Sequence, residues 1–83
     1  MPLFIDVHEH LDGLTDDAAA KAHQADLETQ ERYKVKYLRY WYDTGTGHVF
    51  CLIEAPDKES AIAVHQHGHG LVADRIVEVK EGV

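Results

Sequence analysis

The chain begins with a segment, residues 3–10, in which apolar and polar side chains alternate. Alternation with a period of two is typical of a β-strand with one buried face. One side of this strand carries Leu3, Ile5 and Val7, and the other carries Phe4, Asp6, His8 and His10. Because the first side is uniformly aliphatic, we expect it to pack in the core and the second side to lie on the open face of a sheet.

Turn residues and helix caps divide the rest of the chain into further elements. Thr15 can cap a helix that runs to about Tyr33, and Asp57 can cap a second helix over residues 58–67. Runs rich in β-branched and aromatic residues predict three more strands. The predicted strands cover residues 35–43, 48–55 and 73–79.

The predicted order, β-α-β-β-α-β, is typical of the ferredoxin-like sandwich. This α+β fold has a four-stranded antiparallel sheet in the spatial order 4-1-3-2, with both helices on one face. The chain of 83 residues is short enough to form one such domain over residues 1–83.

Large apolar side chains are predicted on the face of the sheet that the helices leave open. They are Phe4, Trp41, Phe50 and Leu52. Such a patch is normally covered. A second copy of the chain could cover it and form a homodimer. Long loops could also cover it, but so short a chain has few residues for them.

Six of the seven histidines are predicted to meet at one end of the fold. They lie at the end of the first strand, at the start of the antiparallel third strand and at the end of the second helix: His8, His10, His48, His65, His67 and His69. Neutral imidazole is a good ligand for nickel, zinc and copper. We therefore predict a site for a divalent transition metal, with His8, His10, His48, His65, His69 and Asp6 as its ligands.

Taken alone, each histidine pair in this set is also typical of an exposed surface. The pairs are His8 with His10 on the first strand and His65 with His69 at the end of the second helix. His65 and His69 share one helix face only if the helix continues through Gly68. His23 and Asp26 are interpreted as a pair on the surface of the first helix or as a hydrogen-bonded structural group. Cys51 is interpreted as a core residue.

Composition excludes several classes of protein. The formal net charge is −7, which argues against nucleic acid and anionic membranes as partners because both need a basic surface. No apolar run approaches the roughly 20 residues of a membrane span. The N-terminus lacks the features of a signal peptide, and one cysteine cannot form an internal disulfide. We therefore expect a cytoplasmic protein.

Four segments of the chain, together with its first eight residues, MPLFIDVH, resemble a known family. The segments are residues 22–33, 37–43, 49–57 (VFCLIEAPD) and 65–74 (HQHGHGLVAD). The family consists of small bacterial proteins with a domain of unknown function, often named nickel-binding protein. The resemblance implies a ferredoxin-like fold, a homodimer and nickel binding, without an established reaction. His23, His65 and His69 fit the family pattern, and the N-terminal segment favours Asp6 and His8 as family features.

The sequence leaves three classes of function open. The first is a homodimeric nickel-binding protein. The second is a small dimeric enzyme that oxidises or isomerises a small molecule, with His8 or His65 as general base and Asp6 or Asp74 orienting it. The chain lacks a phosphate loop, a nucleophile elbow and a cofactor fingerprint, so we place the enzyme second. The third is a plain interaction module with scattered surface histidines.

Overall fold

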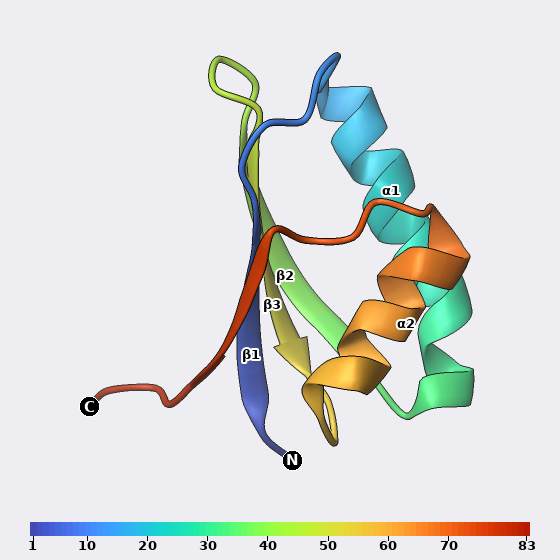
Figure 1. Ribbon diagram of the computed structural model, residues 1–83, viewed down its shortest axis with the longest axis vertical. Coiled ribbons are helices and arrows are strands. Elements are labelled where there is room, and N and C mark those ends of the chain that lie inside the picture. Colours follow the sequence, from blue (N-terminus) through green and yellow to red (C-terminus); the bar gives the residue numbers. More distant parts are fainter.

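Strands and helices follow one another in the predicted order in the computed structural model, which describes all residues from 1 to 83 (Figure 1). The elements are β1 (Leu3–His8), α1 (Asp16–Thr29), the 3₁₀ helix η1 (Gln30–Tyr33), β2 (Lys36–Asp43), β3 (His48–Glu54), α2 (Lys58–Gly68) and β4 (Arg75–Val79). The predicted α+β class is confirmed.

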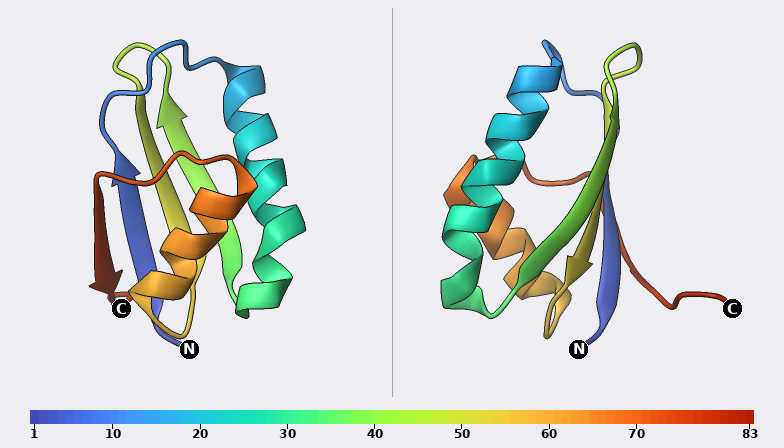
Figure 2. Two further views of the ribbon diagram at one scale, coloured as in Figure 1. Left: turned by 45° about the vertical axis from the view of Figure 1, so that its right-hand side comes forward. Right: turned by 180° about the vertical axis from the view of Figure 1, so that it is seen from behind.

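All four strands form one antiparallel sheet in the order β2-β3-β1-β4, as predicted for the ferredoxin-like sandwich. Figure 2 shows that α1 and α2 cover the same face of this sheet and leave the other face open. Because β1 and β3 are the inner strands, their side chains on the covered face lie directly beneath the helices.

Capping residues set the starts of both helices. The Thr15 side chain accepts a hydrogen bond from the Ala18 amide at 3.0 Å, and Asp57 accepts one from the Ser60 amide at 2.8 Å. The α-helical part of the first helix ends at Thr29 rather than near Tyr33, because the chain tightens into η1 there. Neither helix is long and apolar enough to cross a membrane.

The core lies between the sheet and the helices, and it corrects the predicted orientation of β1. Phe4, Asp6 and His8 are buried, whereas the aliphatic set that begins with Leu3 is only partly buried. The side of β1 that carries polar residues therefore faces the helices. The prediction was wrong because α2 supplies a polar partner, His65, for both Asp6 and His8, so burial does not require an aliphatic side.

The open face of the sheet is apolar, as predicted, although β1 contributes different residues to it. Trp41 and Phe50 occupy opposite positions on β2 and β3 and are 50% and 37% exposed. Val77 on β4 is opposite Ile5 on β1 and is also 50% exposed. An apolar surface therefore crosses all four strands.

Candidate metal centre

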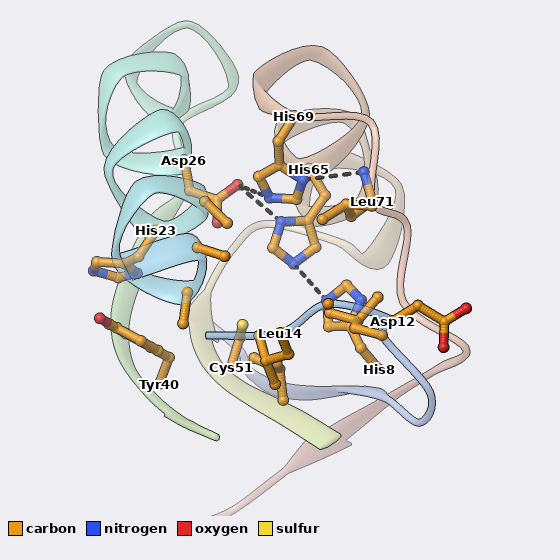
Figure 3. A pocket seen from close by; sticks show the side chains of 16 residues that line it. His8, Asp12, Leu14, His23, Asp26, Tyr40, Cys51, His65, His69 and Leu71 are labelled. Carbon is orange, nitrogen blue, oxygen red and sulfur yellow. Dashed lines mark hydrogen bonds and ion pairs between the residues drawn. The ribbon is translucent and has the colours of Figure 1, made fainter. Parts of the chain in front are cut away.

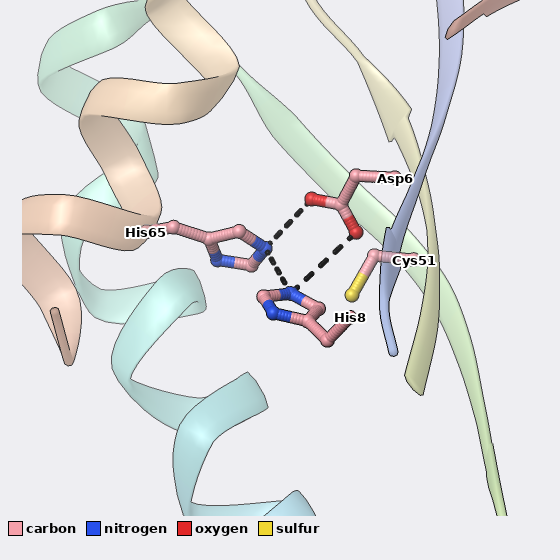
Figure 4. Close-up of side chains that lie close together, drawn as sticks. All are labelled: Asp6, His8, Cys51 and His65. Atoms are coloured by element: carbon pink, nitrogen blue, oxygen red, sulfur yellow. Dashed lines mark hydrogen bonds and ion pairs between the residues drawn. The ribbon is translucent and has the colours of Figure 1, made fainter. Parts of the chain in front are cut away.

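His65 is the centre of a buried network of polar side chains. It lies near the end of α2, and its side chain enters the space between the helices and the sheet (Figure 3). Its Nδ1 lies 2.8 Å from Oδ1 of Asp26 on α1, and its Nε2 lies 2.8 Å from Oδ2 of Asp6 on β1. The same Nε2 is 3.3 Å from Nε2 of His8 (Figure 4). Three elements that are distant in sequence thus meet at one imidazole.

Both nitrogens of His65 donate hydrogen bonds, because a carboxylate can only accept them. Burial disfavours the charged ring, but the hydrogen bonds to Asp26 and Asp6 outweigh burial and raise the pKa of His65 to about 9. His65 is therefore a buried imidazolium at neutral pH, held between two carboxylates.

Asp26 joins the network from α1, and the sequence interpretation missed it. The residue is 2% exposed, so it does not form the surface pair with His23 that was one of the two interpretations; it is hydrogen-bonded, as in the other, but to His65. Its Oδ1 also lies 3.1 Å from Nε2 of His69, whose Nδ1 accepts a hydrogen bond from the Leu71 amide. Burial would raise the pKa of Asp26, but the N–H groups of His65 and His69 hold it below its ordinary value.

A helical spacing could have revealed Asp26. It lies four positions after Ala22 on the stripe of small residues that was predicted to face the core, so it occupies a buried helix face. An aspartate on such a face needs a hydrogen-bonding partner. The histidines of α2 provide it.

His8 and Asp6 retain unused polar atoms at the bottom of the network. Oδ1 of Asp6 and Nδ1 of His8 are buried and have no hydrogen-bond partner. His8 Nε2 lies 3.7 Å from Asp6 Oδ1, which is too long for a hydrogen bond. Burial is the main cause that lowers the pKa of His8, so its ring is neutral at pH 7.

Cys51 lies beneath these side chains on β3, as predicted for a core residue. Burial, with the nearby Asp6 carboxylate, raises the pKa of its thiol. A thiol must lose its proton to bind a metal. Cys51 is therefore the least available donor of the group at neutral pH.

Two sets of donor atoms in this network lie close enough to hold one ion each. The donor atoms of Asp6, His8, Cys51 and His65 are within 4.8 Å of one another, and so are those of Asp26, His65 and His69. Imidazole and carboxylate suit nickel, copper and zinc. The first set fits a metal better, because Asp6 still has a free oxygen there, whereas Asp26 is already committed to two histidines.

Two of the predicted ligands lie outside this network. His10 follows β1 and is exposed, and His48 begins β3 on the open face of the sheet. Their ring centres are 5.9 Å apart, so they form a separate pair at the rim. The six histidines that were predicted to meet at one end therefore do not form one cluster, because β1 turns His8 toward the helices while β3 turns His48 away from them.

A cavity of about 120 Å³ adjoins the network between α1 and the sheet (Figure 3). His8, His23, Asp26, His65 and His69 contribute to its wall, and apolar side chains form most of the rest. The buried polar groups thus border a small, mainly apolar cavity.

The chain matches a family model and a solved structure. The family model described as "Nickel responsive protein SCO4226-like" matches residues 4–79. The crystal structure of SCO4226 from Streptomyces coelicolor A3(2) superimposes with a TM-score of 0.91 at 37% sequence identity, covering 98% of this chain and 99% of that one. No curated protein sequence gives a significant match.

Proposed function

Because the chain belongs to the SCO4226-like family of nickel-responsive proteins, we propose that it binds nickel or a similar divalent transition metal. One observation carries the proposal: two imidazoles and a carboxylate from β1 and α2 converge at a single buried point. Nickel, zinc and copper accept such nitrogen and oxygen donors. Affinity alone would favour copper over nickel, so a preference for nickel would come from the geometry of the site.

His8, His65 and Asp6 are the proposed ligands. The Nε2 atoms of both histidines and the Asp6 carboxylate point toward one another (Figure 4). A ligating histidine usually donates its other ring N–H to a carboxylate, which fixes the orientation of the ring. Asp26 accepts such a bond from Nδ1 of His65.

Metal binding at this point must displace a proton. His65 is protonated on both nitrogens at neutral pH, and a metal can bind only a nitrogen that has lost its proton. We therefore expect nickel to bind more tightly as the pH rises toward 9, with release of about one proton per ion.

The remaining predicted ligands take other roles in this proposal. His69 contacts Asp26, so it stabilises the carboxylate that orients His65. His10 and His48 form a second, exposed site at the rim, where an ion would bind more weakly and exchange faster. The two sites differ in burial and can therefore be separated by mutation.

We also propose that the protein is a homodimer formed through the open face of the sheet. Trp41, Phe50 and Val77 expose large apolar areas there, and neither helix covers that side. A second copy of the chain offers an equally apolar surface and closes the pair by two-fold symmetry. Trp41→Glu should shift the protein to monomers in light scattering after gel filtration, and a wild-type protein that is already monomeric would refute this part.

Calorimetric titration of metal-free protein with NiCl₂ tests the metal site. We expect saturable binding, with affinity reduced at least tenfold in His65→Gln. His67→Gln is the matched control, because His67 is an exposed histidine of the same helix outside the cluster. Circular dichroism and thermal unfolding will show whether each variant remains folded.

The variants distinguish the buried site from the rim. If His48→Gln abolishes binding and His65→Gln has no effect, nickel binds at the rim and the buried assignment is wrong. Absence of saturable binding below millimolar concentrations in the wild-type protein would refute nickel binding altogether.

The enzyme alternative has one observation in its favour, namely that the cavity reaches His8 and His65. Its volume of about 120 Å³ is below the roughly 300–1,000 Å³ of most small-molecule sites. We therefore place metal binding ahead of catalysis.

A further inference from the structure

Two glycines near the end of α2 have different roles. Gly70 has a φ of +79°, and its amide donates a hydrogen bond to the His65 carbonyl at 2.8 Å. A glycine in this conformation is a common helix terminator. Gly68 is the last residue of α2 itself and has no positive φ, so alanine could adopt its backbone conformation and would be the better helix former. Ending the helix therefore does not require glycine at position 68.

Gly68 lies against the backbone of α1. A Cβ atom at this position would lie 3.1 Å from the carbonyl oxygen of Ala25 and 3.3 Å from Oγ1 of Thr29. Both distances are shorter than an ordinary van der Waals contact. The Ala25 carbonyl cannot move aside easily, because it belongs to the backbone of α1 and accepts a hydrogen bond from the Thr29 hydroxyl at 2.8 Å. A side chain at position 68 would therefore push the two helices apart.

The same contact lies next to the polar network. Ala25 precedes Asp26 in the chain, and Gly68 precedes His69. Oδ1 of Asp26 lies 2.8 Å from Nδ1 of His65 and 3.1 Å from Nε2 of His69, between the two helices (Figure 3). Hydrogen bonds from nitrogen to oxygen rarely exceed about 3.2 Å. A small separation of the helices would therefore break the contact with His69 first and lengthen the contact with His65.

From these contacts we propose that Gly68 is a positioning residue of the metal site. Its lack of a side chain lets α2 approach α1 closely enough for Asp26 to hold the ring of His65. The inference rests on the proposed nickel site, in which Asp26 orients His65 from the opposite side of the ring. Loss of such an outer partner typically costs 10–100-fold in metal affinity, so the spacing of the helices at Gly68 contributes to affinity through Asp26.

Crystal structures of metal-free wild type and Gly68→Ala test the geometric part. We expect the distance between Asp26 and His69 to exceed about 3.5 Å in the variant, which is too long for a hydrogen bond. Urea denaturation should show little change in stability, because the gain in helix propensity offsets the contact with α1. A weaker metal site in this variant would then not be the result of unfolding.

Calorimetric titration with NiCl₂ tests the effect on the metal site. Gly68→Ala should bind nickel about fivefold more weakly, a smaller loss than removal of Asp26 itself should cause. Gly82→Ala is the matched control, because a Cβ at Gly82 meets open space, and its affinity should equal that of the wild type. In an Asp26→Ala background, Gly68→Ala should cause no further loss, since the residue through which it acts is absent. Asp26→Asn serves as the background if Asp26→Ala does not fold.

Two results would overturn the inference. Unchanged contacts of Asp26 in the structure of Gly68→Ala would show that the helices tolerate a side chain at this position. Equal losses of affinity from Gly68→Ala with and without Asp26 would show that Gly68 does not act through this carboxylate. A wild-type protein that fails to bind nickel would instead refute the proposed function, and the metal-free structures would still test whether Gly68 sets the contacts of Asp26.

Discussion

The charged state of His65 predicts how the stability of the metal-free protein depends on pH. The pKa of His65 is about 9 in the folded protein and about 6.5 in the unfolded chain. A raised pKa stabilises the fold fully below pH 6.5, and this stabilisation is lost as the pH rises toward 9. Stability should therefore decrease between these two values.

The size of the decrease follows from the difference in pKa. A difference of about 2.5 units, at ~1.4 kcal/mol per unit, makes the full contribution about 3 kcal/mol. His65 is 2% exposed, so solvent screens this interaction little. Raising the pH from 6.5 to 8.5 should remove about 2 kcal/mol from the free energy of unfolding. Staying below pH 9 limits ionisation of the Cys51 thiol in the unfolded chain.

Urea denaturation at pH 6.5, 7.5 and 8.5, with EDTA and a reductant at fixed protein concentration, measures this decrease. His65→Gln should be less stable and lose most of the pH dependence, whereas His67→Gln should keep it. An NMR titration of the His65 ring gives the pKa independently. A free energy of unfolding that is constant within about 0.5 kcal/mol over this range would refute the reasoning, as would a His65 ring that titrates near pH 6.5.

Further predictions concern acid stability, the hairpin and a helix cap. Because burial lowers the pKa of His8, the unfolded chain takes up a proton that the folded protein does not, so urea denaturation should show stability falling below pH 6.5. Gly47→Ala should destabilise the protein by about 1–3 kcal/mol, since Gly47 has a φ of +81° and a Cβ there would lie 2.9 Å from the Leu11 backbone; Gly82→Ala, with open space around it, should have no effect. Asp57→Ala should cost about 1 kcal/mol in thermal unfolding through loss of the α2 cap, while Asp57→Asn should restore most of it.

The order of elements and the sheet topology were predictable because they depend on local signals. Thr15 and Asp57 fix the starts of the helices by capping. Each helix lies between two strands and is long enough to connect them across one face of the sheet. Once the order β-α-β-β-α-β is known, the antiparallel arrangement with β1 in the centre follows from the connectivity rules for this fold.

The orientation of β1 was not predictable from its own residues. Alternation distinguishes the two sides of a strand but does not say which side is buried when both carry apolar groups. The side with Asp6 and His8 is buried because His65, 57 residues after His8, supplies a hydrogen-bonding partner. Only the tertiary structure shows this partner. The same long-range pairing explains why the sequence could not decide whether Asp26 pairs with His23 on the helix surface or belongs to a hydrogen-bonded structural group.

The burial of the proposed metal site also determines how fast nickel can enter and leave it. Asp6, His8 and His65 are only 2–3% exposed, so a hydrated ion cannot reach them while α1 and α2 stay closed on the sheet. Entry and exit must wait for a local opening of these elements. Uptake should therefore reach a limiting rate that no longer depends on nickel concentration, and an ion once held would be released slowly even to a strong chelator. Such a site would retain nickel over long periods rather than exchange it rapidly with its surroundings.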